Sequence, residues 1–449
     1  MPPLLLAMID QTIVSTALPS IAASLGNFDR ITWIVVAYLG ATAISAPVYG
    51  RLGDALGRRR FMTVALILSL VGSLLCAAAP SFELLVVSRA LQGLGGGGLL
   101  SLSYALVRQF VSAKANARIQ GYMAAVALGA SSLGPVLGGQ MTDLFGWRSI
   151  FLLNVPIGVL SLVLLQRLPP RRAPIYPLKF DWIGLALLIA AVLSFLTLVE
   201  SIRQPSDANE LMVLGTSVAF VIFGAVFFRH IGQATNPLLP ATLLVNSTIR
   251  RCAMLALFHG ALYASLMTFA PIYLGMVRGE PAAAIGLLLL PMTFGVGLGS
   301  MLTSFLASRT GKTMIYPSMA LSVGTAILFV CAWKAAELTV TGIAALLGLV
   351  AVAMGTVMVV AQMTVMNEAG GRMLAAASSI VSLARALGAS WGTAVVGLVM
   401  SLLIGSGADT PTHQTHGLLQ NAFIGVFLVI TLFSAVATAL AWSVPRRGL

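Results

Sequence analysis

The feature that most limits the fold is a succession of long apolar stretches separated by short polar loops. A helix needs about 20 apolar residues to cross the hydrocarbon core of a bilayer. Lipid offers backbone groups no partners, and the alternating pattern of a barrel is absent, so only helices are expected to span. Twelve clear spans and two weaker ones (182–202 and 211–229) predict an all-α polytopic membrane protein with 14 transmembrane helices. The predicted spans lie near 3–25, 31–52, 61–80, 84–108, 119–141, 149–167, 182–202, 211–229, 252–277, 284–307, 314–334, 339–366, 375–404 and 419–443.

Composition supports a lipid environment. The chain is 58% hydrophobic and only 9% charged, whereas soluble domains carry roughly 25% charged residues. The net charge of +13 does not predict nucleic-acid binding, because the basic residues form short clusters between apolar stretches, as loop charges do. The expected partners are therefore the bilayer and small molecules, and no nucleic acid.

The loop charges indicate how the chain is oriented. With the N-terminus in the cytoplasm, nineteen of the 26 basic residues fall in inner loops and five in outer loops, while Arg89 and Arg385 lie within spans. This asymmetry fits the positive-inside rule and predicts a plasma-membrane protein with both termini cytoplasmic. Only nine residues precede Asp10, so almost no cytoplasmic segment precedes the first span. A sequence that starts late, or that has lost a short N-terminal tail, would have this form.

Cysteine and histidine usage predicts no metal or other cofactor. The three cysteines lie far apart inside apolar stretches and have no metal-ligand spacing. The histidines form no cluster with an acid, apart from a loop pair near Asp409. A membrane-embedded enzyme therefore remains a remote alternative. His259 within a span could titrate, but a lone histidine is more often a hydrogen-bonded packing residue.

The loop after the second span, residues 50–60, frames one acid and four arginines with glycines. Gly50 and Gly57 permit a tight turn and close helix approach. Asp54 can pair with arginines such as Arg58 or cap a helix end. This combination favours a gating loop over a generic basic inner loop.

The loop after the tenth span repeats this spacing, with Leu306, Ser308, Gly311 and Lys312. The repeat predicts six helices, an inserted pair and six more helices, an arrangement that transporters often use with the substrate site between halves. The predicted divisions are a first bundle over 1–168, an inserted segment over 169–249 and a second bundle over 250–449.

Glycines in the fourth and fifth spans have different interpretations. In the fifth span, small residues four apart let helix backbones touch and a proline bends the helix, although ordinary packing would also use them. The residues concerned are Gly121, Gly134, Pro135, Gly138 and Gly139. In the fourth span the G-x-G-x-x-G pattern does not predict dinucleotide binding, because no strand precedes it.

Charges inside the membrane point most directly to function. A charge at the bilayer centre costs about 2.5–3.5 kcal/mol, so it is a functional hypothesis by default. Asp10 lies about a third of the way along the first span, and Arg89 lies in the fourth with Gln92 one turn on. Asp10 could alternate between protonated and charged forms near Arg89. A purely structural Asp10–Arg89 ion pair is the alternative.

Together these motifs resemble the major facilitator superfamily, and within it the fourteen-helix drug:proton antiporter branch. The segments that carry the resemblance are 9–19, 50–60, 89–98, 121–139, 147–158 and 385–392. The resemblance covers essentially the whole chain. It implies two six-helix bundles that rock around a central cavity, with Arg89 implicated in proton transfer.

The resemblance also implies a transporter and not an enzyme. We expect proton-driven export of hydrophobic or cationic small molecules, and we expect the protein to be a monomer. The alternative is a dedicated exporter of one endogenous product such as a lipid, siderophore or antibiotic. The candidate cavity residues are Asp10, Tyr38, Arg89, Gln92 and Asn154 in the first half and Phe258, Tyr263, Gln362 and Arg385 in the second.

If the loop 50–60 is a gate, a substitution in it should change the rate of transport more than the affinity for substrate. Asp54→Asn is expected to slow transport in proteoliposomes while leaving the affinity for substrate largely unchanged, because the residue would act on the gate. Equal losses in turnover and affinity would contradict a gating role for Asp54.

Overall fold

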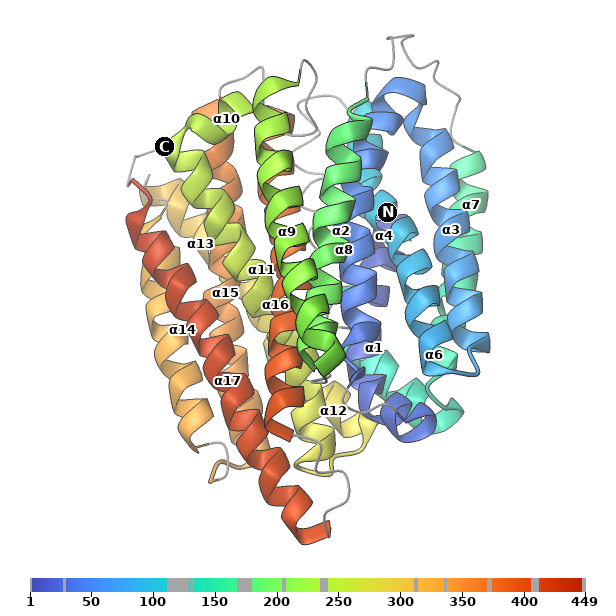
Figure 1. Ribbon diagram of the computed structural model, residues 1–449, viewed down its shortest axis with the longest axis vertical. Coiled ribbons are helices and arrows are strands. Elements are labelled where there is room, and N and C mark those ends of the chain that lie inside the picture. Colours follow the sequence, from blue (N-terminus) through green and yellow to red (C-terminus); the bar gives the residue numbers. More distant parts are fainter. Residues whose placement is uncertain are drawn as a thin grey trace. The chain divides into compact units, whose positions relative to one another are not determined.

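The computed structural model describes residues 2–26, 30–110, 129–130, 133–167, 180–203, 207–234, 241–310, 314–334, 337–369, 374–404 and 412–445. In these ranges the regular structure is entirely helical (Figure 1). The helices of the first half are α1 (Pro2–Leu25), α2 (Trp33–Leu56), α3 (Arg58–Ala78), α4 (Phe82–Phe110), α6 (Ser149–Leu152) and α7 (Asn154–Gln166). The remaining helices are α8 (Trp182–Arg203), α9 (Asp207–Gln233), α10 (Ala241–Val245), α11 (Ser247–Met276), α12 (Ala282–Leu288), α13 (Leu290–Thr310), α14 (Ile315–Lys334), α15 (Val340–Ala369), α16 (Leu374–Ile404) and α17 (Thr412–Ser443).

The helices follow the predicted spans closely. Among the described residues, 12 helical segments are long and apolar enough to cross a membrane. The helix α4 has 29 residues but carries Arg89, Gln92 and a run of glycines, which lower its hydropathy. Most of the predicted span 119–141 lies outside the described residues, and residues 133–145 are helical. The structure therefore confirms an all-helical membrane protein, and the count of fourteen spans stays a prediction.

Prolines account for two interruptions within predicted spans. Pro156 has no N–H to donate to the carbonyl of Leu152, and the helix breaks at Leu153 between α6 and α7. Pro291 acts in the same way after Leu289, where α12 gives way to α13. The first break matters for function because it places Asn154 at the start of α7.

Contacts between Cα atoms divide the chain into two compact units. The first comprises Met1–Leu178, Leu266–Gly299 and Leu338–Val352, and the second comprises Lys179–Ser265, Ser300–Glu337 and Ala353–Leu449. The boundary crosses α11, α13 and α15, so the units do not coincide with the predicted division of the sequence at 168 and 249. That division into bundles stays a prediction.

In the first unit, α4 packs closely against α2 and α3 (Figure 1). One face of α3 is buried and carries small side chains such as Ala65, Ser69 and Gly72, whereas the other exposes Ile67 and Leu74. Small residues let membrane helices approach closely, since no hydrophobic force drives lipid-soluble helices together. The larger apolar residues are left for the bilayer to cover.

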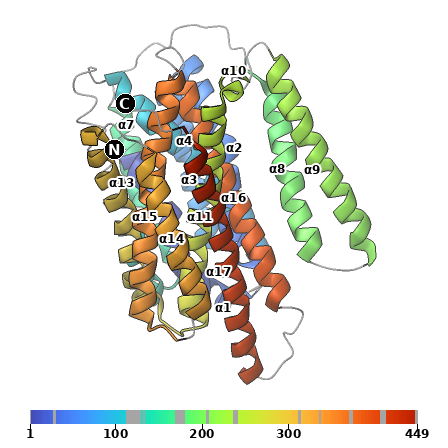
Figure 2. The same ribbon diagram turned by 90° about the vertical axis from the view of Figure 1, so that its left-hand side faces the viewer.

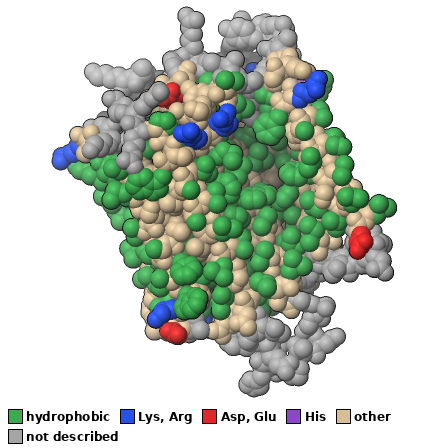
Figure 3. All heavy atoms as spheres, turned by 60° about the vertical axis from the view of Figure 1, so that its left-hand side comes forward, with side chains coloured by type: hydrophobic (Ala, Val, Ile, Leu, Met, Phe, Trp, Pro, Cys, Tyr) green, Lys and Arg blue, Asp and Glu red, His purple; other side chains and the backbone are tan. Residues whose placement is uncertain are grey.

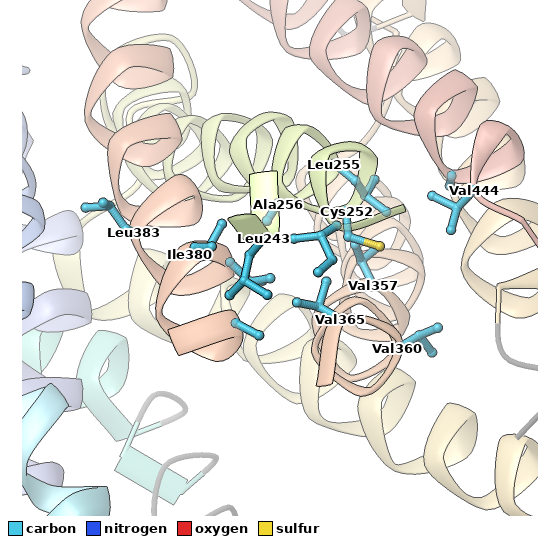
Figure 4. Packing of buried hydrophobic residues seen from close by; sticks show 14 of the residues in the cluster. Leu243, Cys252, Leu255, Ala256, Val357, Val360, Val365, Ile380, Leu383 and Val444 are labelled. Atoms are coloured by element: carbon cyan, nitrogen blue, oxygen red, sulfur yellow. The ribbon is translucent and has the colours of Figure 1, made fainter. Parts of the chain in front are cut away.

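The second unit is organised around a hydrophobic cluster to which α8, α9, α10, α11, α14, α15, α16 and α17 contribute (Figure 4). The inserted pair α8 and α9 lies side by side (Figure 2). It supplies Leu188, Phe227 and Ile231 to this cluster. Asp181 accepts hydrogen bonds from the N–H of Gly184 (2.8 Å) and from His230 Nε2 (2.7 Å), which ties the two helices together. The pair therefore packs into the core of its unit near one end, through the start of α8 and the end of α9, while most of α9 is exposed.

The outer surface is apolar where a bilayer would contact it. On the face shown in Figure 3, Lys and Arg side chains lie toward the two ends, and hydrophobic side chains cover much of the area between them. Exposed apolar residues include Leu211 at 78%, Val221 at 66% and Phe228 at 69% in α9 alone. Such exposure would be unfavourable in water and indicates a surface solvated by lipid.

The gating-loop glycines differ in their conformational demands. Gly57 separates α2 from α3 with φ 108° and ψ 117°, and its N–H donates to the carbonyl of Gly53 at 3.0 Å. A side chain is strained at this φ. No described atom lies within 4 Å of a Cβ built on Gly50, so Gly50 makes no close helix approach to the described residues. The side chain of Asp54 lies outside the described residues.

This contrast generates a stability prediction. Gly57→Ala is expected to destabilise the protein by about 1–2 kcal/mol because alanine must adopt a left-handed backbone. Gly50→Ala is the matched control, because its Cβ meets open space. Thermal unfolding of the purified variants in detergent measures both, and equal melting temperatures for Gly57→Ala and wild type would contradict the argument.

Candidate functional site

Asp10 lies in α1 and is 2% exposed. It receives three hydrogen bonds from three different side chains. Gln92 Nε2 and Asn154 Nδ2 each donate to Oδ1 at 2.7 Å, and Arg89 Nη1 donates to Oδ2 at 3.1 Å. All three partners are donors, and donors are the partners that a carboxylate oxygen can accept from.

Arg89 lies in α4 and is 1% exposed. Besides Asp10, its Nη1 donates to Gln92 Oε1 at 2.6 Å, and its Nε donates to the carbonyl of Ile34 at 3.3 Å. The guanidinium carbon lies 4.1 Å from the centre of the Tyr38 ring and 5.8 Å from that of Phe151. Aromatic faces attract cations, so four kinds of neighbour stabilise this buried charge.

Side chains from α3 and α7 complete the network. Ser73 Oγ accepts hydrogen bonds from Gln92 Nε2 at 2.7 Å and from Asn154 Nδ2 at 3.2 Å. The Cys76 thiol donates to Gln92 Oε1 at 3.6 Å. Each of these four residues is at most 1% exposed. We call Asp10, Ser73, Arg89, Gln92 and Asn154 the carboxylate network, which joins α1, α3, α4 and α7.

Glycines in α3 and α4 allow these helices to come close enough for the network to form. A Cβ on Gly72 would lie 2.6 Å from the Cα of Gln92, and a Cβ on Gly93 would collide with the backbone of Tyr38. The Gly93 carbonyl also accepts a hydrogen bond from Thr42 Oγ1 at 3.1 Å. The glycine-rich sequence of α4 therefore serves close packing against α2 and α3.

Asn154 is the member whose bonding is incomplete. Its Nδ2 has two acceptors, but its Oδ1 has no hydrogen-bond partner among the described residues. A rotation of the amide by a half-turn would present this oxygen to Asp10. The side chain can thus donate to an ionised carboxylate and accept from a protonated one, which is the behaviour that a proton-dependent switch requires.

The glycines of the predicted fifth span also face other helices of the first unit. A Cβ on Gly134 would collide with Thr12, and one on Gly138 would collide with the carbonyl of Ile13. Gly139 faces the carbonyl of Ala282 in α12 in the same way, and the carbonyl of Pro135 faces Gly286 there. Helix 133–145 thus packs directly against α1 and α12. Gly121 lies outside the described residues.

The predicted second-half residues are found in the second unit but not in one cluster. The ring of Phe258 packs against Trp391 at 5.9 Å, while Gln362 Nε2 donates to Ser382 at 3.4 Å. Tyr263 stacks on His259 with an interplanar angle of 9°. Arg385 is half-buried. His259 is buried and bonds to a backbone carbonyl, as its interpretation as a packing residue predicts.

Sequence reasoning missed Ser73, Cys76 and Phe151. Ser73 offered a weak signal, because it is a polar residue beside Gly72 in an otherwise strongly apolar span. Phe151 offered none, because an aromatic residue in a membrane span is ordinary. No group of three His, Cys, Asp or Glu side chains that could hold a metal ion occurs in the described part of the chain.

A family model described as the Major Facilitator Superfamily matches residues 4–393. Solved structures agree on the fold. A D-xylose-proton symporter superposes with a TM-score of 0.67 at 15% identity, covering 100% of this chain and 98% of its own. A bacterial homologue of the human lysosomal transporter Spinster, in an inward-facing conformation, gives a TM-score of 0.67 at 16% identity, covering 98% and 94%. The chain therefore belongs to the major facilitator superfamily.

Relatives of known name point to efflux. Multidrug resistance protein 3 of Bacillus subtilis is 32% identical over 327 residues, which cover 72% of this chain and 64% of that protein. The multidrug transporter protein MdtP of Bacillus subtilis is 28% identical over 401 residues, covering 89% and 73%. The chain thus spans less than two thirds of the first of these relatives. Their names support the multidrug efflux branch that the motifs resemble.

The geometry of the carboxylate network predicts a role for Asn154. Asn154→Leu removes both the donor to an ionised Asp10 and the acceptor for a protonated one. We expect substrate-induced proton flux in proteoliposomes to slow by about tenfold to a hundredfold, because a hydrogen bond to a charged group contributes about 1.5–3 kcal/mol.

The matched control is Asn421→Leu, which changes an exposed asparagine in α17. It should leave the flux unchanged. A wild-type flux from an Asn154→Leu protein with an unaltered melting temperature would contradict the role assigned to Asn154.

Proposed function

We propose that this member of the major facilitator superfamily is a proton-coupled antiporter that exports hydrophobic small molecules by alternating access. One observation carries the proposal: a carboxylate, Asp10, is buried in a membrane-spanning helix with donors from α4 and α7 around it. Burying an ion in a medium without water is costly, and such residues in membrane helices mark ion pathways and proton relays. Asp10 is the one acidic residue classed as buried in the described part of the chain.

The surroundings of Arg89 support a change of protonation at Asp10. When Asp10 takes up a proton, the guanidinium loses its anionic partner. It keeps the Gln92 oxygen, the Ile34 carbonyl and the Tyr38 ring. These dipoles and the aromatic face partly replace the lost charge pair, so that neutral Asp10 leaves no bare buried cation.

The structural alternative is weighed on energy. Breaking a buried pair costs about 3–5 kcal/mol, yet apolar residues of similar volume often stabilise a protein equally well. A pair that served stability alone would also need hydrogen bonds to its remaining polar atoms, so Gln92 and Ser73 are compatible with either role. The amide oxygen of Asn154, which has no partner among the described residues, favours a site that changes state, and the experiment below separates the two roles.

The transport cycle follows from the linkage between protonation and access. We place the protein in the plasma membrane with both termini cytoplasmic, with six helices, an inserted pair and six more. Protons entering from outside would neutralise Asp10 as substrate is released there, and loss of the proton to the inside would accompany binding of the next substrate. Export of several dyes with similar affinity would favour multidrug efflux, and one strongly preferred compound would favour a dedicated exporter.

The central prediction concerns Asp10→Asn, which keeps the volume and removes the titrating group. We expect the variant to lose substrate-induced proton flux in proteoliposomes by at least about a hundredfold, since no carboxylate remains to carry the proton. Wild-type efflux of a fluorescent dye should also stop when an uncoupler collapses the proton gradient.

Glu83→Gln is the matched control, because Glu83 is an exposed acid in the first turn of α4. It should transport and couple as the wild type does. Normal proton flux through a folded Asp10→Asn protein would refute the proposal, whereas a lowered melting temperature with normal flux would assign the ion pair to stability.

A further inference from the structure

The hydroxyl of Ser73 lies between two side-chain amides that both serve Asp10. Ser73 is in α3, Gln92 is in α4 and Asn154 is at the start of α7. Gln92 Nε2 donates to Asp10 Oδ1 and to Ser73 Oγ, each at 2.7 Å. Asn154 Nδ2 donates to the same carboxylate oxygen at 2.7 Å and to the same hydroxyl at 3.2 Å. Two amide nitrogens therefore bridge one carboxylate oxygen and one hydroxyl oxygen.

The hydrogens of these two amides are fully used in this arrangement. A side-chain amide nitrogen carries two hydrogens, and here each nitrogen gives one to Asp10 and the other to Ser73. A buried N–H without an acceptor is costly. Ser73, Gln92 and Asn154 are each at most 1% exposed. The serine hydroxyl thus supplies an acceptor that bulk water does not supply to either amide.

The two amides differ in their freedom to turn. Gln92 Oε1 accepts from Arg89 Nη1 at 2.6 Å and from the Cys76 thiol at 3.6 Å. A half-turn of Gln92 would place N–H groups against the guanidinium, which has donors only. The Oδ1 of Asn154, by contrast, has no partner among the described residues. The amide of Asn154 can therefore turn, whereas that of Gln92 is fixed.

Glycine contacts hold α3 against the two helices that carry these amides. A Cβ on Gly72 would lie 2.6 Å from the Cα of Gln92, so α3 and α4 touch at the residue before Ser73. A Cβ on Gly158 in α7 would collide with the side chain of Leu70 in α3. Removal of the Ser73 hydroxyl therefore takes hydrogen bonds out of a framework that other contacts keep in place.

We propose that Ser73 is a positioning residue that orients both amides and thereby sets how tightly Asp10 holds its proton. The inference rests on the proposed proton-coupled function. With Asp10 ionised, the hydroxyl accepts one hydrogen from each amide and keeps both nitrogens toward the carboxylate. With a proton bound at Asp10 Oδ1, Asn154 turns and its Oδ1 accepts from the new carboxyl O–H. The hydroxyl then reverses and donates to the same amide oxygen, because a hydroxyl can do either.

Loss of the hydroxyl disfavours the ionised state more than the protonated one. In Ser73→Ala, an ionised Asp10 leaves one N–H of Gln92 and one N–H of Asn154 without their acceptor. After proton uptake and the turn of Asn154, its Oδ1 still accepts from the carboxyl O–H, and the N–H of Gln92 is the group that lacks its former acceptor. The difference is one unpaired buried donor, so the variant should bind the proton more tightly.

Other charged or titratable groups near Asp10 stay the same when Ser73 is substituted. Arg89 of α4, Tyr38 of α2 and Cys76 of α3 interact electrostatically with the carboxyl group. The helices α6, α7 and α12 have no titratable side chain. In helix 133–145, Asp143 accepts from the Ala283 N–H at 2.9 Å. A change in proton binding at Asp10 on substitution of Ser73 therefore reports the hydroxyl.

Infrared difference spectroscopy of the purified full-length chain measures proton binding without a substrate. The C=O stretch of a protonated carboxyl grows as the pH falls, and Asp10→Asn identifies the band of Asp10 by removing it. We expect Ser73→Ala to raise the pH at which this band reaches half its amplitude, by an amount that corresponds to a proton affinity about three- to tenfold higher.

Further variants separate the hydroxyl from the fold. Ser69→Ala is the matched control, because Ser69 lies one turn earlier on the same buried face of α3 and is 3% exposed. It should keep the wild-type midpoint, and so should Ser73→Thr, which retains a hydroxyl. Ser73→Cys has only a weak donor and acceptor and should shift the midpoint upward, which decides the question where Ser73→Ala does not fold.

A wild-type midpoint in folded Ser73→Ala or Ser73→Cys, or an equal shift in Ser69→Ala, would overturn the positioning role alone. A wild-type spectrum without any band that Asp10→Asn removes would overturn it together with proton binding at Asp10. The first result leaves the proposed export function standing and the second does not, so the two failures are distinguishable.

Discussion

The packing of the first unit is organised around one carboxylate, Asp10, that is buried within a membrane-spanning helix. A charge in hydrocarbon is costly unless donors replace its hydration shell. Asp10 obtains three donors within 3.1 Å from Arg89, Gln92 and Asn154. These side chains reach it only because α4 and α7 lie beside α1. The demand for donors around one oxygen pair therefore fixes the packing of the helices that surround it.

Close helix packing in turn explains features of the sequence that look unrelated to charge. The glycines of α4 let its backbone touch α2 and α3, and a methyl group at Gly72 or Gly93 would hold the helices apart. Pro156 interrupts the helical hydrogen bonds of the sixth span next to Asn154, close to where its amide meets Asp10. Small residues and prolines are thus part of the same design as the buried charges, since they set the distances over which the hydrogen bonds form.

The sequence predicted the helices well and named several residues that the structure brings together, for definable reasons. Span length and hydropathy are local properties, so predicted ranges such as 3–25 and 61–80 recur as α1 and α3. Asp10, Arg89 and Gln92 stood out because polar residues are rare in membrane spans. Ser73 and Phe151 did not, since their role depends on which helices become neighbours. In the second half the same reasoning named Tyr263 and Arg385 but not the close approach of α11 to α16 at Gly260, because that contact is a tertiary one.

The charge balance of the carboxylate network bears on the proposed coupling of transport. Arg89 and Asp10 balance each other, so uptake of one proton by Asp10 would change the net charge of the network from neutral to positive. The Gln92 oxygen, the Ile34 carbonyl and the Tyr38 ring would then remain around the guanidinium. The neighbours that stabilise the buried ion pair would therefore also stabilise the cation after a proton breaks the pair, which is what a coupling site requires.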